Sequence, residues 1–232
     1  MAGRRVVRGV LQLTHPISNA YLLDGGSGLV LVDCGMPGRL AELRREIERA
    51  RHVAGRDLAA IVITHAHVDH AGSLARLAAT VHAPVLVGTR DAARIREGGV
   101  PPASKPTGPL GRLMAAMSPG FAIEASRVDA LVEDGSEVPG APGMRAIATP
   151  GHTPGHTSFL WPEQGGVLFA GDVAVNVLGL RESFVHDDRQ VARATLARLA
   201  ELEFEVAVFG HGPPIVGHAV AHFRRLAERL AR

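Results

Sequence analysis

Three histidines and an aspartate lie within six consecutive residues, and their side chains could hold metal ions. His65, His67, Asp69 and His70 directly follow the apolar run Leu58–Thr64, so we expect them in the loop at the carboxyl end of a buried strand. Imidazole and carboxylate groups suit divalent first-row metals. Alternate residues of an extended loop point the same way, so His65 and His67 can share one ion while Asp69 and His70 turn toward a second. A chance cluster is disfavoured, because these groups would repel one another without a cation.

Ligand-type side chains also end three later apolar segments. They are His152 or His156 in the stretch 149–157, Asp172 after the run 166–170, and His211 after the run 205–209. Each signal alone is weak, because a Gly-His pair is more often a turn than a ligand. Loops at one edge of a scaffold can nevertheless assemble a site from distant parts of the sequence, and the repeated pattern predicts such a polynuclear site.

The elements that must position these residues are short and numerous. Apolar and β-branched runs predict strands at 5–13, 17–24, 28–33, 58–64, 84–87, 127–132, 144–149, 157–161, 166–170 and 205–209. Apolar residues spaced by three or four predict helices at about 37–53, 71–82, 89–97, 188–202 and 217–231. The 27 glycines and 15 prolines have no fixed period and suit turns between these elements. We expect an α/β or α+β domain with two sets of strands.

One segment, at about 98–120, differs in composition from the rest. Glycines and prolines there surround a short predicted helix, Leu110–Met117, and such a stretch is typically an insertion or a lid. Leu110, Leu113, Met114 and Met117 offer an apolar face that could cover the metal site or simply pack on the core. A lid of this kind would favour an acyl or otherwise apolar substrate over a large polyanion.

Composition and charge restrict the class of protein. The 232 residues are 46% hydrophobic and 21% charged, which fits one globular domain over 1–232. The formal charge is only +2 and the arginines are spread along the chain, so no nucleic-acid partner is expected. Cys34 is the single cysteine, and neither a signal peptide nor a stretch of ~18 apolar residues is present. These features favour a cytoplasmic protein that does not enter a membrane.

Taken in order, the motifs His-x-His-x-Asp-His, Pro-Gly-His-Thr, Gly-Asp and Gly-His resemble those of the metallo-β-lactamase-fold hydrolase superfamily. The resemblance extends from the element 31–35 to His211. It implies an α/β (α+β) fold, a four-layer αββα sandwich, with two divalent metal ions at one edge. The implied ligands are His65, His67 and His152 on one ion, Asp69, His70 and His211 on the other, and Asp172 as the bridge. Zinc is the first choice for both ions, with iron or manganese as alternatives.

The resemblance also implies roles for individual side chains. Two ions would share a hydroxide as nucleophile, and Asp69 would orient it and carry a proton to the leaving group. His156, the second histidine of its motif, would support the loop. Asp33 is interpreted as a hydrogen-bonding turn residue rather than a support of the metal loops, and Cys34 as a packed side chain. The other histidines are expected to be ordinary surface or core residues: His15, His52, His82, His186, His218 and His222.

The nearest branches of the superfamily narrow the reaction. The ligand set resembles that of glyoxalase II, although only 21 residues (232 minus 211) follow His211, which disfavours a glutathione thioester as substrate. Lactonases of acyl-homoserine lactones often use a tyrosine soon after the bridging aspartate, but the only tyrosine here is Tyr21. The sequence therefore favours a dinuclear hydrolase of a small thioester, lactone or related ester, in the glyoxalase II-like or lactonase-like branch.

Two other activities share this fold. A mononuclear iron dioxygenase acting on glutathione persulfide uses a His, His, Asp subset of the same ligands and is the alternative prediction. A metal-dependent nuclease is a further alternative, disfavoured by the nearly balanced charge and the short chain. A small-molecule substrate is expected, and the sequence assigns neither its binding residues nor an oligomeric state.

Overall fold

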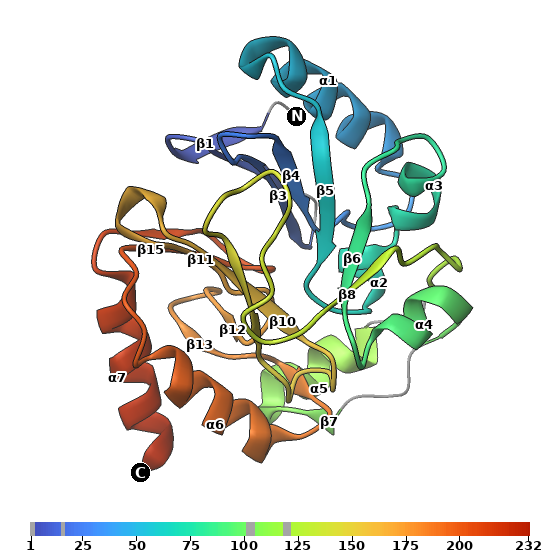
Figure 1. The fold of residues 1–232 in the computed structure, drawn as a ribbon. Coiled ribbons are helices and arrows are strands. Elements are labelled where there is room, and N and C mark those ends of the chain that lie inside the picture. The colour runs from blue at the N-terminus through green and yellow to red at the C-terminus, as the bar shows by residue number, and fades with distance from the viewer. Residues whose placement is uncertain (1–2, 15–16, 101–104, 118–121) are drawn as a thin grey trace.

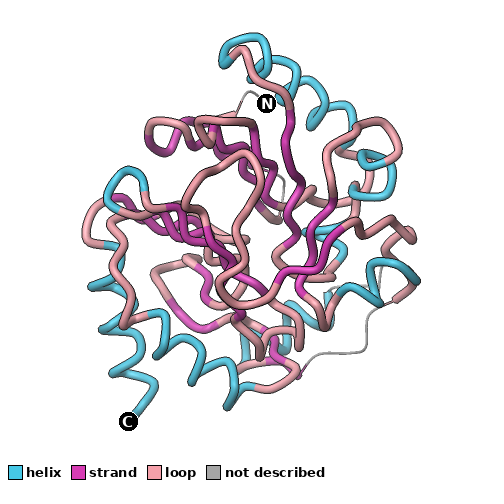
Figure 2. Tube along the Cα trace, in the orientation of Figure 1, coloured by secondary structure: helices cyan, strands magenta, loops and turns pink. Residues whose placement is uncertain are grey.

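Two β-sheets form the centre of the molecule, and helices cover their outer faces (Figure 1). The computed structural model describes residues 3–14, 17–100, 105–117 and 122–232. Figure 2 shows the strands between two groups of helices on opposite sides of the molecule. This arrangement confirms the predicted four-layer αββα sandwich.

The first sheet contains seven strands in the order β1-β2-β3-β4-β5-β6-β8. They are β1 (Arg4–Val7), β2 (Val10–Thr14), β3 (Asn19–Asp24), β4 (Leu29–Val32), β5 (Leu58–Ile63), β6 (Val85–Gly88) and β8 (Ala130–Val132). Strands β1 to β4 pair antiparallel, whereas β4, β5, β6 and β8 run parallel. The loops that follow β4, β5 and β6 therefore lie together at one edge of this sheet, which is where α/β sheets bind ligands.

The helices beside this sheet are α1 (Leu40–Ala54), α2 (Val68–Ala71), α3 (Leu74–Ala78) and α4 (Ala92–Glu97). Two predictions in this half are wrong in detail. The expected strand at 5–13 is a hairpin, because Gly9 at φ +83° turns the chain between β1 and β2. The expected helix at 71–82 is the shorter α3, and α2 precedes it, so Asp69 and His70 lie in a helical turn and not in the expected loop. The Ser73 hydroxyl holds the break between the two helices by donating to the Met36 carbonyl (2.6 Å) and accepting the N–H of Arg39 (3.2 Å).

The second sheet contains five strands in the order β16-β15-β11-β10-β9. They are β9 (Arg145–Ala148), β10 (Thr157–Trp161), β11 (Val167–Phe169), β15 (Val206–Val208) and β16 (Ile215–Val216), with the short 3-10 helix η1 (Glu163–Gly165) before β11. Its outer face is covered by α6 (Arg189–Leu199) and α7 (Ala219–Ala231). Strands β11 and β15 are parallel neighbours, so the segments after them also meet at one edge.

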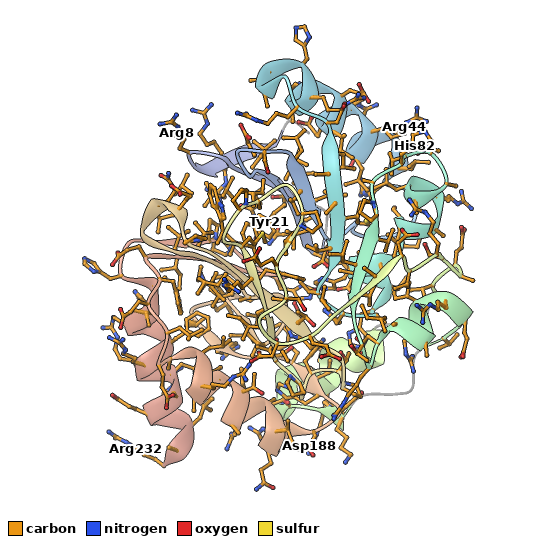
Figure 3. All side chains as sticks on the ribbon, viewed as in Figure 1. Arg8, Tyr21, Arg44, His82, Asp188 and Arg232 are labelled. Carbon is orange, nitrogen blue, oxygen red and sulfur yellow. The ribbon has the colours of Figure 1, made fainter. Side chains whose placement is uncertain are left out.

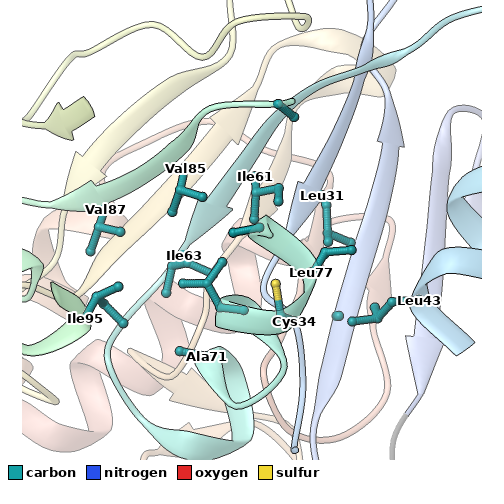
Figure 4. Close-up of a cluster of buried hydrophobic side chains, with 14 of the residues drawn as sticks. Leu31, Cys34, Leu43, Ile61, Ile63, Ala71, Leu77, Val85, Val87 and Ile95 are labelled. Carbon is teal, nitrogen blue, oxygen red and sulfur yellow. The ribbon is translucent and has the colours of Figure 1, made fainter. Parts of the chain in front are cut away.

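Apolar side chains fill the three spaces between the four layers. Successive residues of β5 point to opposite faces, so Ile61 and Ile63 pack toward the helices while Val62 packs toward the second sheet. Figure 4 shows the first of these clusters, in which Cys34 is fully buried, as predicted. Burial raises the pKa of the Cys34 thiol, so it remains an inert thiol at neutral pH. Among the described residues, no helix is long and apolar enough to cross a lipid bilayer.

The segment at 98–120 contains α5 (Gly108–Met117), which the sequence predicts as a slightly shorter helix. Before it, β7 (Lys105–Pro106) pairs with β14 (Val185–His186), and the Thr107 N–H donates to the Phe184 carbonyl at 2.6 Å. A second small pairing joins β12 (Ala174–Val175) to β13 (Arg181–Glu182). Of the predicted apolar face, Leu113 is exposed, and the side chains of Leu110, Met114 and Met117 lie outside the described part of the chain. The predicted lid remains a proposal.

Candidate metal centre

The two sheets deliver their ligand-bearing loops to the same edge of the sandwich. The Thr157 N–H donates to the Thr64 carbonyl at 2.8 Å, which ties the start of β10 to the end of β5. The Asn19 N–H donates to the Gly210 carbonyl at 2.8 Å, which ties β3 to the segment after β15. The predicted ligands, although far apart in the sequence, therefore lie at the junction of the two sheets.

A trio of imidazoles forms the first half of the centre. The Nε2 atom of His152 lies 3.1 Å from Nε2 of His65 and 3.0 Å from Nδ1 of His67. The opposite nitrogen of His152, Nδ1, lies 2.8 Å from the Val185 carbonyl, to which it can only donate, so its Nε2 keeps a free lone pair. Three convergent nitrogens of this kind are a typical zinc ligand set.

A second group contains Asp69, His70 and His211, whose ligand atoms all lie within 4.8 Å of one another. Oδ2 of Asp69 lies 3.3 Å from Nε2 of His211 and 3.6 Å from Nε2 of His70. The Nδ1 atom of His211 donates to the Ile17 carbonyl, which leaves its Nε2 directed at the carboxylate. The group therefore combines one carboxylate with two oriented imidazoles.

Asp172 lies between the two groups. Its Oδ2 is 3.0 Å from Nε2 of His211 and 3.7 Å from Nε2 of His152, and its Oδ1 is 3.6 Å from Nε2 of His70. Oδ1 of Asp172 and Nε2 of His70 are both buried without a hydrogen-bond partner. Leaving buried polar atoms unpaired is costly, and a divalent cation would satisfy both at once. All seven predicted ligand residues are thus brought together, and their donor atoms fit metal binding.

The two halves of the centre differ in charge. Burial lowers the pKa of His152 to about 4, with His67 adding to the effect, so this imidazole is neutral and able to bind a metal. Burial also acts on His70, but the carboxylates around its ring, Asp69 and Asp172 first, outweigh it and raise its pKa to about 9. The half that contains these carboxylates therefore attracts a cation, either a proton or a metal ion.

Asp33 has a larger role than the turn residue that the sequence favours. Its buried carboxylate accepts the Thr64 N–H at 2.8 Å, and its Oδ2 accepts from Nδ1 of His70 at 2.8 Å. The second bond fixes the ring of His70 with Nε2 toward the centre, as carboxylates commonly do for metal-binding histidines. The structure therefore corrects the earlier interpretation: Asp33 supports the loop that follows β5.

Two further histidines lie beside the centre. Nε2 of His156 accepts the Asp172 N–H at 2.9 Å and its Nδ1 bonds the Thr149 hydroxyl at 2.7 Å, so both nitrogens serve the loop. His186 was expected to be an ordinary residue, and it is a buried one whose ring centroid lies 6.2 Å from that of His152. Both of its ring nitrogens lack hydrogen-bond partners. His15 lies outside the described residues.

Two polar residues of β3 hold the segment that carries His211, and neither role was predicted from the sequence. The Tyr21 hydroxyl donates to the Phe209 carbonyl at 2.7 Å and accepts the Phe209 N–H at 3.1 Å. The side-chain amide of Asn19 donates to the carbonyls of Phe209 and Gly212, at 3.0 and 2.9 Å. Figure 3 shows Tyr21 in the middle of the molecule. Polar residues at alternate positions of an otherwise apolar strand were the available signal.

Replacing Tyr21 with Phe should lower the free energy of unfolding by about 1–3 kcal/mol, because the buried N–H of Phe209 loses its acceptor. Urea unfolding of the two proteins measures the difference, with an unchanged m-value showing that the native fold is kept. A loss below about 0.5 kcal/mol would mean that this pair of hydrogen bonds contributes little net stability.

The chain is similar in sequence to known proteins of one superfamily. The family model of the metallo-beta-lactamase superfamily matches residues 13–211. The chain is 34% identical to the probable metallo-hydrolase YflN of Bacillus subtilis strain 168, over 99% of this chain and 94% of that protein. It is 27% identical to thioesterase pkgB of Emericella nidulans over 93% of this chain, but spans only 52% of that protein.

A solved structure shows the same fold. BJP-1, a subclass B3 metallo-beta-lactamase of Bradyrhizobium japonicum, aligns with a TM-score of 0.72 and 24% identity, covering 100% of this chain and 92% of the other. The fold and the site together define a metal-dependent hydrolase. The chain belongs to the metallo-β-lactamase superfamily.

Proposed function

We propose that this protein is a dinuclear hydrolase, with zinc as its metal, that cleaves a small thioester, lactone or related ester. The observation that carries the proposal is the position of Asp172 between two ligand groups, within 3.7 Å of Nε2 of His152 and 3.0 Å of Nε2 of His211. Each group supplies three side chains, the number of protein ligands typical of a catalytic zinc site, and Asp172 would be available to either ion. The relative pkgB is a thioesterase by name, which supports the substrate class.

Bound divalent ions would supply an ionised water at neutral pH and polarise the carbonyl oxygen of the substrate. Asp69 has the position to handle the proton, since its side chain is part of the centre yet remains 18% exposed. His70 and His211 outweigh burial and hold the pKa of Asp69 below its usual range, so it is ionised at neutral pH and can accept a hydrogen bond from the attacking water. We assign it to orient the attacking water and to pass the proton on.

The proposed reaction balances without any further reactant. The water oxygen forms a bond to the carbonyl carbon, and the C–S or C–O bond breaks. The proton taken by Asp69 goes to the leaving thiolate or alkoxide, so the products are an acid and a thiol or an alcohol.

Apolar residues beside the centre favour an acyl substrate. Ile17, whose carbonyl accepts from His211, has 53% of its surface exposed. Leu178 is 92% exposed and lies two residues after Asn176, whose N–H donates to the His211 carbonyl at 3.0 Å. Exposed apolar side chains next to a polar centre are typical of a site that takes an apolar ligand portion.

Metal content is the first test of this proposal. Elemental mass spectrometry of protein purified without chelator or added metal should find about two equivalents per chain, mainly zinc. A screen of thioesters and lactones should then show kcat/KM rising with acyl length. One equivalent of iron, with oxygen consumption on a persulfide, would replace the proposal with the dioxygenase. A protein without bound metal would overturn the ligand assignment.

A further inference from the structure

A buried aspartate outside the ligand set connects the loops of the imidazole trio. Asp91 follows β6, directly before α4, and is 3% exposed. Its Oδ2 accepts the Ala66 N–H at 2.9 Å and the Thr153 hydroxyl at 2.7 Å, and its Oδ1 accepts the Gly155 N–H at 2.8 Å. One carboxylate thus holds two segments that are far apart in the sequence.

The atoms that Asp91 binds are immediate neighbours of the trio. Ala66 lies between His65 and His67, and Thr153 directly follows His152. Gly155 packs so closely that a Cβ there would lie 2.2 Å from the backbone nitrogen of Asp91. The distance between the two ligand loops therefore depends on the carboxylate between them.

Asp91 has a counterpart in the other half of the centre. Asp33 follows β4 and Asp91 follows β6, so the two carboxylates lie on either side of the loop after β5. Asp33 orients His70, a member of the second ligand group. By position, then, each group has one buried carboxylate that supports it.

We propose that Asp91 is a positioning residue that sets the separation of the 65–67 loop from His152 and thereby the metal affinity of the imidazole trio. The proposal rests on the metal-binding function proposed above. Hydrogen-bonding partners just outside a metal site typically change metal affinity by about 10–100-fold when they are removed. Asp91 contacts two backbone N–H groups and the Thr153 hydroxyl but none of the imidazole rings, so its effect is on where the three imidazoles lie.

An Asp91→Asn variant isolates this role, because it keeps the size of the side chain but leaves only one acceptor oxygen. In either orientation, the amide NH₂ group faces a backbone N–H, that of Gly155 or that of Ala66. A donor then opposes a donor, and one loop is released. Asp129→Asn is the matched control, since Oδ2 of Asp129 accepts the Val85 N–H at 2.8 Å at the opposite end of β6.

The experiment is a zinc titration of the metal-free, full-length proteins in competition with a chromophoric chelator. Asp91→Asn should weaken one of the two binding steps by about 10–100-fold, while Asp129→Asn changes neither. Combination with ligand variants identifies the step. Asp91→Asn should have no further effect when His67→Ala has already removed the trio, and should keep its full effect beside His211→Ala.

Thr153 provides an independent check of the same contact. Thr153→Ser keeps the hydroxyl that Asp91 accepts and should bind zinc like the unmodified protein, whereas Thr153→Val should show part of the loss. A general loss of folding would instead weaken both steps equally and lower the melting temperature of the metal-free protein, and that result would overturn the proposal.

The two proposals fail in different ways. If the unmodified protein binds only one zinc ion, the dinuclear function is wrong, and weakening of that single step by Asp91→Asn would still support the role of Asp91. If Asp91→Asn binds zinc with unchanged affinity at every step, the role of Asp91 is overturned whatever the number of ions.

Discussion

An Asp172→Asn variant is expected to lose about 10²–10³-fold in kcat and about one equivalent of bound metal. Asp172 approaches both ligand groups, and its Oδ1 is buried without another partner. The NH₂ group that replaces one oxygen cannot act as a ligand, and the neutral side chain has no charge to balance a cation. Because metal polarisation of a carbonyl contributes several kcal/mol to transition-state stabilisation, the loss of one ion removes about two to three orders of magnitude in rate.

Steady-state kinetics on the best substrate of the screen, with elemental analysis of the same samples, would measure both losses. Asp57→Asn is a suitable control, because the side chain of Asp57 is 82% exposed. Among the described residues its ion-pair partner is Arg51, which also lies on the surface. Retention of both ions together with kcat within tenfold of the unmodified enzyme would contradict the role assigned to Asp172.

Removal of the metal is expected to abolish hydrolysis and to lower the melting temperature by about 10 °C. An ion present at about 1,000 times its Kd stabilises the folded state by about 4 kcal/mol, and each kcal/mol corresponds to about 2–4 °C for a chain of this size. Differential scanning fluorimetry before and after dialysis against a chelator measures the change. Addition of zinc should restore both stability and activity.

The same measurement should depend on pH in a defined direction. In the metal-free protein the pKa of His70 is about 9, raised by the carboxylates of Asp69 and Asp172 against the effect of burial. A raised pKa stabilises the folded state fully below the unfolded value of about 6.5, and this contribution disappears as the pH rises through about 9. The melting temperature gained on zinc binding should therefore increase between pH 6.5 and 9. An unchanged melting temperature after chelation at every pH would contradict the expected contribution of bound metal to stability.

The larger elements could be predicted from the sequence because each depends on a local pattern. The apolar run at 58–64 is β5, and the spacing of apolar residues at 217–231 agrees with α7, because burial of a face follows directly from periodicity. The pairs β12–β13 and β7–β14 were not predicted, since each of their strands has two residues and exists only through its partner. The hairpin at Gly9 was missed for a different reason, because the apolar residues on both sides of the turn resemble one continuous strand.

The residue types of the candidate site could be predicted from the chain alone, since the seven ligand-type side chains belong to short motifs at strand ends. The residues that support these side chains are known only from the three-dimensional fold. Asp91 lies 62 residues from Thr153 and Tyr21 lies 188 residues from Phe209, so neither contact has a local signal. The packing of two sheets brings these groups within hydrogen-bond distance, and burial then makes each unpaired polar atom costly. For that reason the roles of Asp33 and Asp91 can be assigned only from the fold, whereas the metal-ligand set can be predicted from local sequence motifs.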